Sequence, residues 1–405
     1  MIQVLDMWGR GNAQMTPAQI AQETHPPYDS VWGAFQPQYW HPGMILSRYY
    51  LPNEDEALIS GNNLAYFQAN HPDWILHGCD KNGNPQPNAL AWSGTGFPND
   101  VPLDIHNPAV VQYELQQIGQ YAVAHGYNTV AFDNIVFKNY MVSPNPMLGD
   151  GEGGSKPGWY GCGIYQNGNF IPRYNPESSP DQSAWTNDIL NFLAQAHSTF
   201  NSTYHLHILV NHPPFDPSPD GNERTMLASV DGMLDERGFV AYGSPQSTNG
   251  FNEALGWMQY MQSNGKAIFM TDYWCIGSGC PTDPSQMTPT QVDFGLATYA
   301  LGNYGGAGVY ISQASGATYT SRPEYSATYG SACSTYTKFG TAYTRRFKGG
   351  FAVANPSDGT TQPVPWPTGH TYRDVTGRTI SNPLSVAPGD AFMLLLTSGG
   401  DGCSP

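Results

Sequence analysis

The first 346 residues alternate between two patterns of apolar and polar positions. Short runs of β-branched or other apolar residues alternate with longer stretches that repeat apolar residues at helical spacing. This order predicts parallel strands joined by crossover helices. We expect strands near residues 29–33, 44–50, 74–77, 128–133, 207–211, 232–236, 267–272 and 308–312.

Helix signals separate these strands. Asn107 followed by Pro108 is typical of a helix N-cap with proline at the first helical position, and the apolar repeat then continues to Gly126. Further helices are expected over residues 181–200, 251–264 and 289–301. The pattern therefore predicts an α/β fold, a (β/α)8 TIM barrel over residues 1–346. A doubly wound open sheet is the alternative, but no Gly-rich dinucleotide fingerprint follows the early strands.

The last part of the chain, residues 347–405, has a different sequence pattern. Strand-like runs at residues 351–357, 371–376 and 391–396 are separated by Gly and Pro turns. Residues 362–367 are rich in proline and are expected to form a loop. These features predict a small antiparallel β-sandwich as a separate C-terminal module.

Composition narrows the functional classes. The 405 residues hold 16 Lys+Arg against 32 Asp+Glu, a formal net charge of −16, and the hydrophobic fraction of 40% is enough for a sizeable core. Because phosphate binding needs clustered Lys and Arg, we expect neither nucleic acid nor an anionic membrane surface as a partner. No apolar run approaches the length that spans a bilayer, so no membrane span is expected. Only 12% of residues are charged, a composition common in secreted proteins that meet neutral polymers.

Six cysteines bear on the cellular compartment. They show no metal-ligand spacing, and an even count outside a zinc pattern favours disulfides, for which we predict the pairs Cys275–Cys280, Cys79–Cys162 and Cys333–Cys403. Residues 1–6 lack a basic and an apolar leader region. We expect a secreted or extracytoplasmic protein whose leader has been removed; six unpaired thiols in a cytosolic enzyme is the alternative.

Three carboxylates end predicted parallel strands. Asp133, Glu236 and Asp272 each follow an apolar run, and in a parallel barrel the carboxyl ends of the strands carry function. Two carboxyls that face one cleft can cleave a glycosidic bond, because one protonates the leaving oxygen while the other attacks the anomeric carbon or activates water. The alternative for any single one is a helix cap or a loop ion pair.

Aromatic residues follow the same strands. Sugars stack on aromatic faces, so we predict substrate contacts at Trp92, Trp159, Tyr273 and Trp274. The alternative is that these rings pack the long loops internally.

Two basic side chains complete the candidate site. His212 ends the strand at 207–211, where it could contact a sugar hydroxyl or be a satisfied loop histidine. Arg48 could orient a carboxylate or pair with Glu54 or Asp55.

Two of these strands resemble motifs of barrel glycoside hydrolases. Residues 126–134, GYNTVAFDN, resemble the motif G-[FY]-D-G-[VI]-x-[LF]-D-N, with Asn128 where an Asp is usual. Residues 230–236, VDGMLDE, are similar to a later D-G-V-x-x-E strand. The group includes glycosyl hydrolases of unknown specificity, endo-α-1,4-galactosaminidases and spherulin-type families. The resemblance implies that Asp133 is the nucleophile, Asn134 a substrate-orienting neighbour and Glu236 the general acid/base.

The leading hypothesis is therefore a glycoside hydrolase that degrades a polysaccharide or oligosaccharide, with a retaining mechanism expected and no cofactor. A catalytically inert barrel that binds glycans is one alternative. A metallohydrolase is another, because His205 and His207 form an H-x-H pair. This pair lies at the start of its strand, opposite the expected active face, which favours structural histidines.

Overall fold

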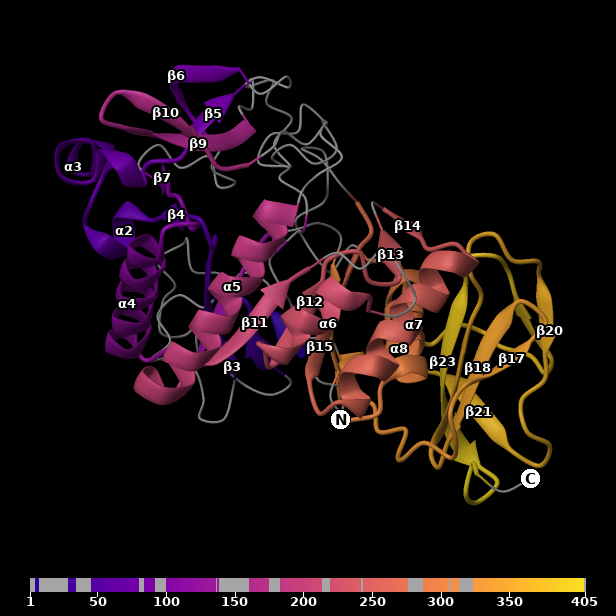
Figure 1. The fold of residues 1–405 in the computed structure, drawn as a ribbon. Helices are drawn as coiled ribbons and strands as arrows, with labels where there is room; N and C mark the ends of the chain where they lie inside the picture. Colours follow the sequence, from indigo (N-terminus) through magenta and orange to yellow (C-terminus); the bar gives the residue numbers. More distant parts are fainter. Residues whose placement is uncertain are drawn as a thin grey trace. The chain divides into compact units, whose positions relative to one another are not determined.

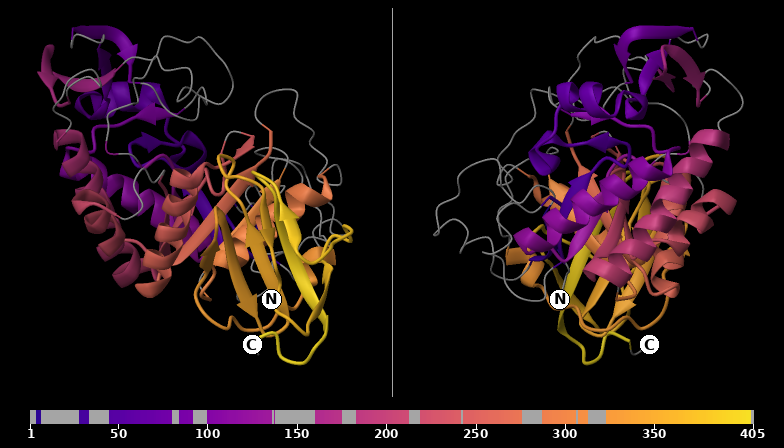
Figure 2. Two further views of the ribbon diagram at one scale, coloured as in Figure 1. Left: turned by 90° about the vertical axis from the view of Figure 1, so that its right-hand side faces the viewer. Right: turned by 60° about the vertical axis from the view of Figure 1, so that its left-hand side comes forward.

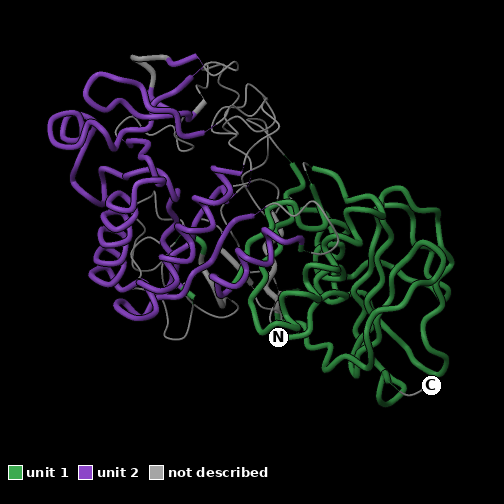
Figure 3. Tube along the Cα trace, in the orientation of Figure 1, with its two compact units in different colours: residues 1–45, 213–219, 232–405 green, residues 46–212, 220–231 purple. Residues whose placement is uncertain are grey.

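The computed structural model describes residues 4–6, 28–33, 45–79, 84–91, 100–135, 137, 160–174, 183–212, 219–241, 243–275, 287–305, 307–312 and 323–403. The chain forms two compact units (Figure 3). Unit 1 comprises residues 1–45, 213–219 and 232–405, and unit 2 comprises residues 46–212 and 220–231. Figure 1 labels the helices and strands.

Unit 2 contains parallel strands covered by helices. Strands β3 (Ile45–Tyr50), β8 (Thr129–Phe132) and β11 (His207–Asn211) pair in parallel, with β8 in the middle. The helices are α4 (Pro108–His125), α5 (Ser183–Thr199) and α6 (Gly221–Ala228), and a π-helical segment, η3 (Phe200–Tyr204), continues α5. Helix α4 begins and ends where the sequence predicts: the Asn107 side chain accepts a hydrogen bond from the Ala109 N–H, and Gly126 ends the helix in the left-handed region at φ 83°.

Unit 2 also contains an antiparallel sheet, where the sequence predicts one of the parallel strands. Residues 72–74 form a short 3-10 helix, η2 (Pro72–Trp74), and the strand that follows, β5 (His77–Cys79), is antiparallel. It pairs with β6 (Pro85–Leu90) and β9 (Tyr160–Gln166), and β9 pairs with β10 (Asn169–Pro172). The predicted Cys79–Cys162 disulfide is confirmed and links β5 to β9. The prediction of a parallel strand at 74–77 is therefore wrong, because these residues lead into the antiparallel sheet.

Shorter elements of unit 2 surround a small apolar cluster. They are β4 (Glu54–Asp55), α2 (Ala57–Ser60), α3 (Leu64–Asn70) and β7 (Val101–Pro102). The cluster consists of Phe67, Ile75, Val101, Leu103 and Val110, all buried. It joins the start of α4 to these short elements.

Unit 1 contains a second parallel sheet, in the order β2-β1-β16-β15-β12. Its strands are β1 (Val4–Asp6), β2 (Tyr28–Val31), β12 (Gly232–Asp235), β15 (Ala267–Tyr273) and β16 (Ala307–Ser312). Helices α7 (Thr248–Ser263) and α8 (Pro289–Gly302) follow β12 and β15, and the hairpin β13 (Val240–Ala241) and β14 (Ser244–Pro245) precedes α7. The sequence did not predict β1, whose three residues are too few to show a pattern.

The C-terminal module is antiparallel, as predicted (Figure 2). One sheet has the order β17-β18-β19-β23-β21, and β20 pairs with β22. The strands are β17 (Thr337–Phe339), β18 (Ala342–Phe347), β19 (Gly350–Ala354), β20 (Gln362–Val364), β21 (Thr371–Asp374), β22 (Leu384–Val386) and β23 (Ala391–Ser398). Both sheets contribute to one apolar core that includes Val353, Val364 and Leu394. Residues 362–364, expected in a loop, form β20.

The C-terminal module begins earlier in the chain than residue 347, its predicted start. Strands β17 and β18 belong to its main sheet, so this sheet begins at Thr337. The predicted Cys333–Cys403 disulfide is confirmed and ties the segment before β17 to the C-terminal tail. For the third pair, Cys275 lies in the described part of the chain but Cys280 does not, so this pairing stays a prediction.

A buried polar joint connects α8 to the module within unit 1. The Arg378 guanidinium contacts the Asp293 carboxylate of α8 at 2.8 Å and the Asp390 carboxylate at 2.9 Å. The Thr376 hydroxyl oxygen lies 3.0 Å from Asp293 Oδ2 and 2.6 Å from Asp374 Oδ1. The α8 face that carries Asp293 is thereby fixed to the turn after β21.

The environment of Asp293 favours its protonated form. Burial and the neighbouring Asp374 carboxyl raise the pKa of Asp293 to about 9, although Arg378 acts in the opposite direction. Because an unfolded Asp has a pKa of about 3.9, the folded protein retains a proton that the unfolded chain releases. The stability that depends on this proton is therefore lost as the pH rises from about 4 toward about 9.

We predict that Asp293→Asn makes stability less dependent on pH. Asn imitates the neutral acid, so the melting temperature of the variant should fall less between about pH 5 and pH 8 than that of the unsubstituted protein. Thermal melts at both pH values measure the difference. Asp390→Asn is the matched control, because Asp390 contacts the same guanidinium but is partly exposed, and it should keep the original pH dependence. Parallel curves for Asp293→Asn and the unsubstituted protein would refute the role of Asp293.

Candidate active site

Asp133 lies directly after β8 in unit 2, at the carboxyl end of the parallel strands. The Asn211 side chain, at the end of the neighbouring strand β11, donates a hydrogen bond of 2.7 Å to Asp133 Oδ1. The Asn134 side chain lies 3.4 Å from Oδ2, and Asn134 adopts a left-handed conformation at φ 53°. The Asp133 backbone N–H is bound to the Tyr50 carbonyl of β3. Three neighbouring parallel strands thus position this carboxylate.

Desolvation dominates the electrostatics of Asp133. Burial of the carboxyl raises its pKa above the usual range, and the hydrogen bonds from the Asn211 side chain and the Asn134 backbone oppose this shift because they stabilise the ionised form. No cation of the described residues is among the causes of this pKa shift. The Asp133 carboxylate is therefore held by neutral donors, which fix its orientation without neutralising its charge.

His212 and Arg48, both predicted to bind substrate, are buried in unit 2. His212 Nδ1 lies 2.6 Å from the Ile135 carbonyl and Nε2 lies 3.2 Å from Glu223 Oε1. Both ring nitrogens have protein partners, which fits the alternative of a satisfied histidine. Arg48 forms an ion pair of 2.6 Å with Glu56, a partner that the sequence analysis does not name. Glu56 is the N-cap residue of helix α2, and this position places its carboxylate within reach of Arg48.

Glu236 and Asp272 belong to unit 1 and are connected through one turn. Glu236 follows β12 and is partly exposed. The Asp272 carboxyl of β15 is buried, and its Oδ1 accepts hydrogen bonds from the backbone N–H groups of Phe239 (2.8 Å) and Val240 (3.1 Å). Gly238, at φ 36°, lies so close that a Cβ there would be 2.6 Å from this oxygen. Asp272 therefore fixes the turn that begins with Glu236.

The environment of Asp272 is also desolvated. Burial raises its pKa to about 7, against the effect of the two backbone N–H groups, and Asp235 adds to the rise. Its second oxygen, Oδ2, has no hydrogen-bond partner in the part of the chain that the structure describes. Asp235 itself accepts a hydrogen bond from the Arg237 backbone, and the Arg237 guanidinium pairs with Glu253.

The predicted aromatic contacts are only partly described. Trp92 and Trp159 lie outside the described residues. Tyr273 is buried, and the half-buried Trp274 packs edge-on against Phe294 of α8 at 5.5 Å between ring centroids. For these two rings the geometry fits the alternative of internal packing.

Sequence reasoning missed the role of Asn211. In the sequence analysis, a function is assigned only to its neighbour His212. The missing information was the strand register, in which Val210 pairs with Phe132, so that Asn211 and Asp133 follow side by side.

The histidines of the H-x-H pair have protein partners. His205 contacts the Asn201 carbonyl, and His207 lies 3.4 Å from Asp231 at the start of β11. Within the described residues, no group of three or more His, Cys, Asp or Glu could hold a metal ion.

Comparisons with known proteins find distant structural likeness. Neither a scan against protein-family models nor a search of curated protein sequences finds a match. Similar solved structures include a maltogenic α-amylase from Thermotoga neapolitana, with 10% identity, 98% of each chain covered and a TM-score of 0.45. Trehalose-6-phosphate hydrolase from Bacillus licheniformis has 11% identity, 98% and 99% coverage and a TM-score of 0.45. Ega3 from Aspergillus fumigatus, in complex with galactosamine, has 12% identity, covers 76% of this chain and 89% of its own, and has a TM-score of 0.36.

No helix within the described residues combines the length and the apolar character that crossing a membrane requires.

We predict that Asp272→Ala loosens the turn that carries Glu236, whereas Asp272→Asn does not. Alanine leaves two buried backbone N–H groups without an acceptor, at a cost of about 2–4 kcal/mol, while asparagine keeps an acceptor oxygen and should cost about 1 kcal/mol or less. Amide hydrogen exchange at residues 236–240, together with thermal melts, measures both effects. Equal loosening in the two variants would show that the Oδ1 acceptor does not hold this turn.

Proposed function

We propose that this protein is a glycoside hydrolase that cleaves a polysaccharide or oligosaccharide, with Asp133 and Glu236 as its two carboxylates. The observation that carries the proposal is the position of Asp133: a desolvated carboxylate at the carboxyl end of a parallel strand, held by neutral donors from the next strand. A carboxylate oriented in this way is suited to attack an anomeric carbon, because no ion pair among the described residues competes for its charge.

We further propose that the two parallel sheets close into one (β/α)8 barrel as the catalytic domain, followed by the C-terminal module, whose main sheet begins at Thr337 rather than at the expected residue 347. In such a barrel the ends of β8 and β12 open on the same face, and Glu236 would protonate the leaving oxygen. The matching position of Asp133 and Glu236, each one residue beyond its parallel strand, supports this arrangement.

We also propose roles for the individual residues and a cellular location. Asp133 would act as the nucleophile of a retaining mechanism, which requires the two carboxyls to lie about 5–5.5 Å apart. Asn134 would orient the substrate beside Asp133. The disulfides Cys79–Cys162 and Cys333–Cys403 support a secreted or extracytoplasmic location, because such bonds persist in oxidising compartments.

We predict that Asp133→Asn and Glu236→Gln each lower the turnover of a cleaved glycan by about 10²–10⁴-fold, since each removes a group that acts in the transition state. Release of reducing ends from a panel of neutral and amino-sugar polysaccharides measures this. The matched control is Asp231→Asn, which changes an acid at the opposite end of β12 and should leave turnover unchanged. Unchanged turnover in both site variants would refute the assignment, and glycan binding without any turnover would favour the inert barrel.

A pH profile tests Asp133 separately. The nucleophile must be ionised, so activity should fall as the pH drops through the pKa of Asp133. Asn211→Ala removes a hydrogen bond that stabilises the carboxylate, so the acidic limb of kcat/KM should move to higher pH by about one unit. Asn134→Gly keeps the backbone N–H that also lowers this pKa, and it should move the limb much less. An unmoved limb in Asn211→Ala would contradict the role of Asp133.

A further inference from the structure

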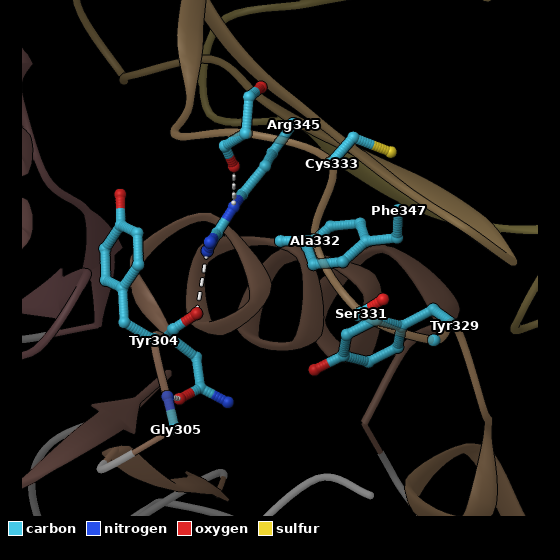
Figure 4. A pocket seen from close by; sticks show the side chains of 11 residues that line it. Tyr304, Gly305, Tyr329, Ser331, Ala332, Cys333, Arg345 and Phe347 are labelled. Atoms are coloured by element: carbon cyan, nitrogen blue, oxygen red, sulfur yellow. Dashed lines mark hydrogen bonds between the residues drawn. The ribbon is translucent and has the colours of Figure 1, made fainter. Parts of the chain in front are cut away.

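A pocket of about 520 Å³ lies between the end of α8 and the C-terminal module, entirely within unit 1 (Figure 4). Its walls come from residues 303–305 after α8, from residues 329–334 before β17, and from Arg345 and Phe347 of β18. None of these residues belongs to the candidate active site. The pocket therefore needs its own explanation.

Arg345 is the main polar group of this pocket. Its side chain is buried, with the residue only 3% exposed, and Nη1 donates to the carbonyls of Ala300 (2.9 Å), Leu301 (3.0 Å) and Asn303 (2.7 Å) at the end of α8. Nε donates to the Ser334 carbonyl at 2.9 Å. These bonds account for a helix-capping role but leave Nη2 without a partner among the described residues. Arg345 lines the pocket, so Nη2 is the guanidinium nitrogen left to donate to a molecule bound there.

Within the described residues, the guanidinium of Arg345 has no carboxylate beside it. The charged or ionisable neighbours that influence it are Tyr304 and Tyr329. In contrast, the guanidinium groups of Arg48, Arg173, Arg237 and Arg378 each contact a carboxylate. A buried cation is costly unless it is compensated, and the partial negative charge at the end of α8 compensates only the Nη1 side.

The surrounding sequence is also basic. Residues 325–357 contain Lys338, Arg345, Arg346 and Lys348 and no Asp or Glu, in a chain whose net charge is −16. Of these four basic residues, Arg345 is the one that lines the pocket.

An aromatic platform lies beside the cation. The Arg345 guanidinium is 4.3 Å from the centroid of the Tyr304 ring and 5.3 Å from that of Phe347, and Figure 4 shows it between these two rings. Tyr304 is 40% exposed. The guanidinium lies over one face of Tyr304, so a sugar ring that carries a carboxylate would pack on the exposed remainder of the tyrosine ring while an oxygen accepts from Nη2.

We propose that this pocket is a second glycan site, specific for a carboxylate-bearing sugar such as a uronic acid residue, with Arg345 Nη2 as the anion-binding donor and Tyr304 as the platform. The choice of a sugar as the carrier of the carboxylate rests on the proposed function. The anion site itself follows from Arg345 and its surroundings.

Calorimetric titration of the full chain with trigalacturonate and with its methyl ester tests the charge requirement. Trigalacturonate should bind, and the ester should bind at least about tenfold more weakly, because a charge-assisted hydrogen bond is lost. Added salt should weaken trigalacturonate binding. Equal binding of the two probes, or no binding of trigalacturonate, would overturn the proposal. Full competition by acetate at equal concentration would show that the sugar ring contributes nothing and would also overturn it.

Two surface aromatics provide matched variants. Tyr304→Ala should weaken trigalacturonate binding by about tenfold. Phe339→Ala should leave it unchanged, because Phe339 is similarly exposed at 39% but lies outside the pocket wall. Equal effects of the two variants would place the sugar elsewhere. Arg345→Gln should abolish binding, and a thermal melt separates this effect from loss of the α8 cap, while Tyr304→Ala and the ester remain informative if this variant does not fold.

The same titration separates this pocket from the catalytic proposal. Asp133→Asn should bind trigalacturonate as tightly as the unsubstituted protein, because the two sites share no residue. Hydrolysis of a glycan without binding of trigalacturonate would refute this inference alone. Binding without any hydrolysis would refute the proposed function alone.

Discussion

The compensation of desolvated carboxylates by neutral donors underlies the arrangement of the candidate site. Asp272 cannot be hydrated where it lies, so its Oδ1 takes two backbone N–H groups from the turn after β12, and the path of this turn follows from that need. Asp133 is held in the same way by the Asn211 amide. In both cases the protein uses dipoles, which orient a carboxylate while leaving its charge available.

Much of the architecture is readable from local sequence signals. The caps of α4 are visible because Asn107, Pro108 and Gly126 satisfy steric and hydrogen-bonding needs that depend on the backbone alone. Strand β8 and the first half of β15 stand out because their residues are mostly buried and apolar. The antiparallel module shows itself through its frequent Gly and Pro turns. These signals act over a few residues, so they survive without any knowledge of the tertiary fold.

The sequence predictions fail for features that depend on contacts between segments far apart in the chain. Residues 74–76 are apolar, and Ile75 and Leu76 are buried, yet this segment leads into an antiparallel sheet in which β5 pairs with β9, far along the chain. Asn211 acquires its role from the register between β11 and β8. Two of the three predicted cysteine pairs are confirmed, although cysteine spacing alone does not fix their connectivity.

The joint between Asp293 and Arg378 limits how this chain can be recombined. An apolar seam between a helix and a β-module can be exchanged for another of similar shape, because burial is not directional. Here a cut between α8 and β17 would leave the buried Asp293 in one fragment and Arg378 in the other. Neither fragment would then keep both partners of this ion pair, so neither is suited to recombination as an independent domain. The module is therefore expected to be inherited together with the helix on which it rests.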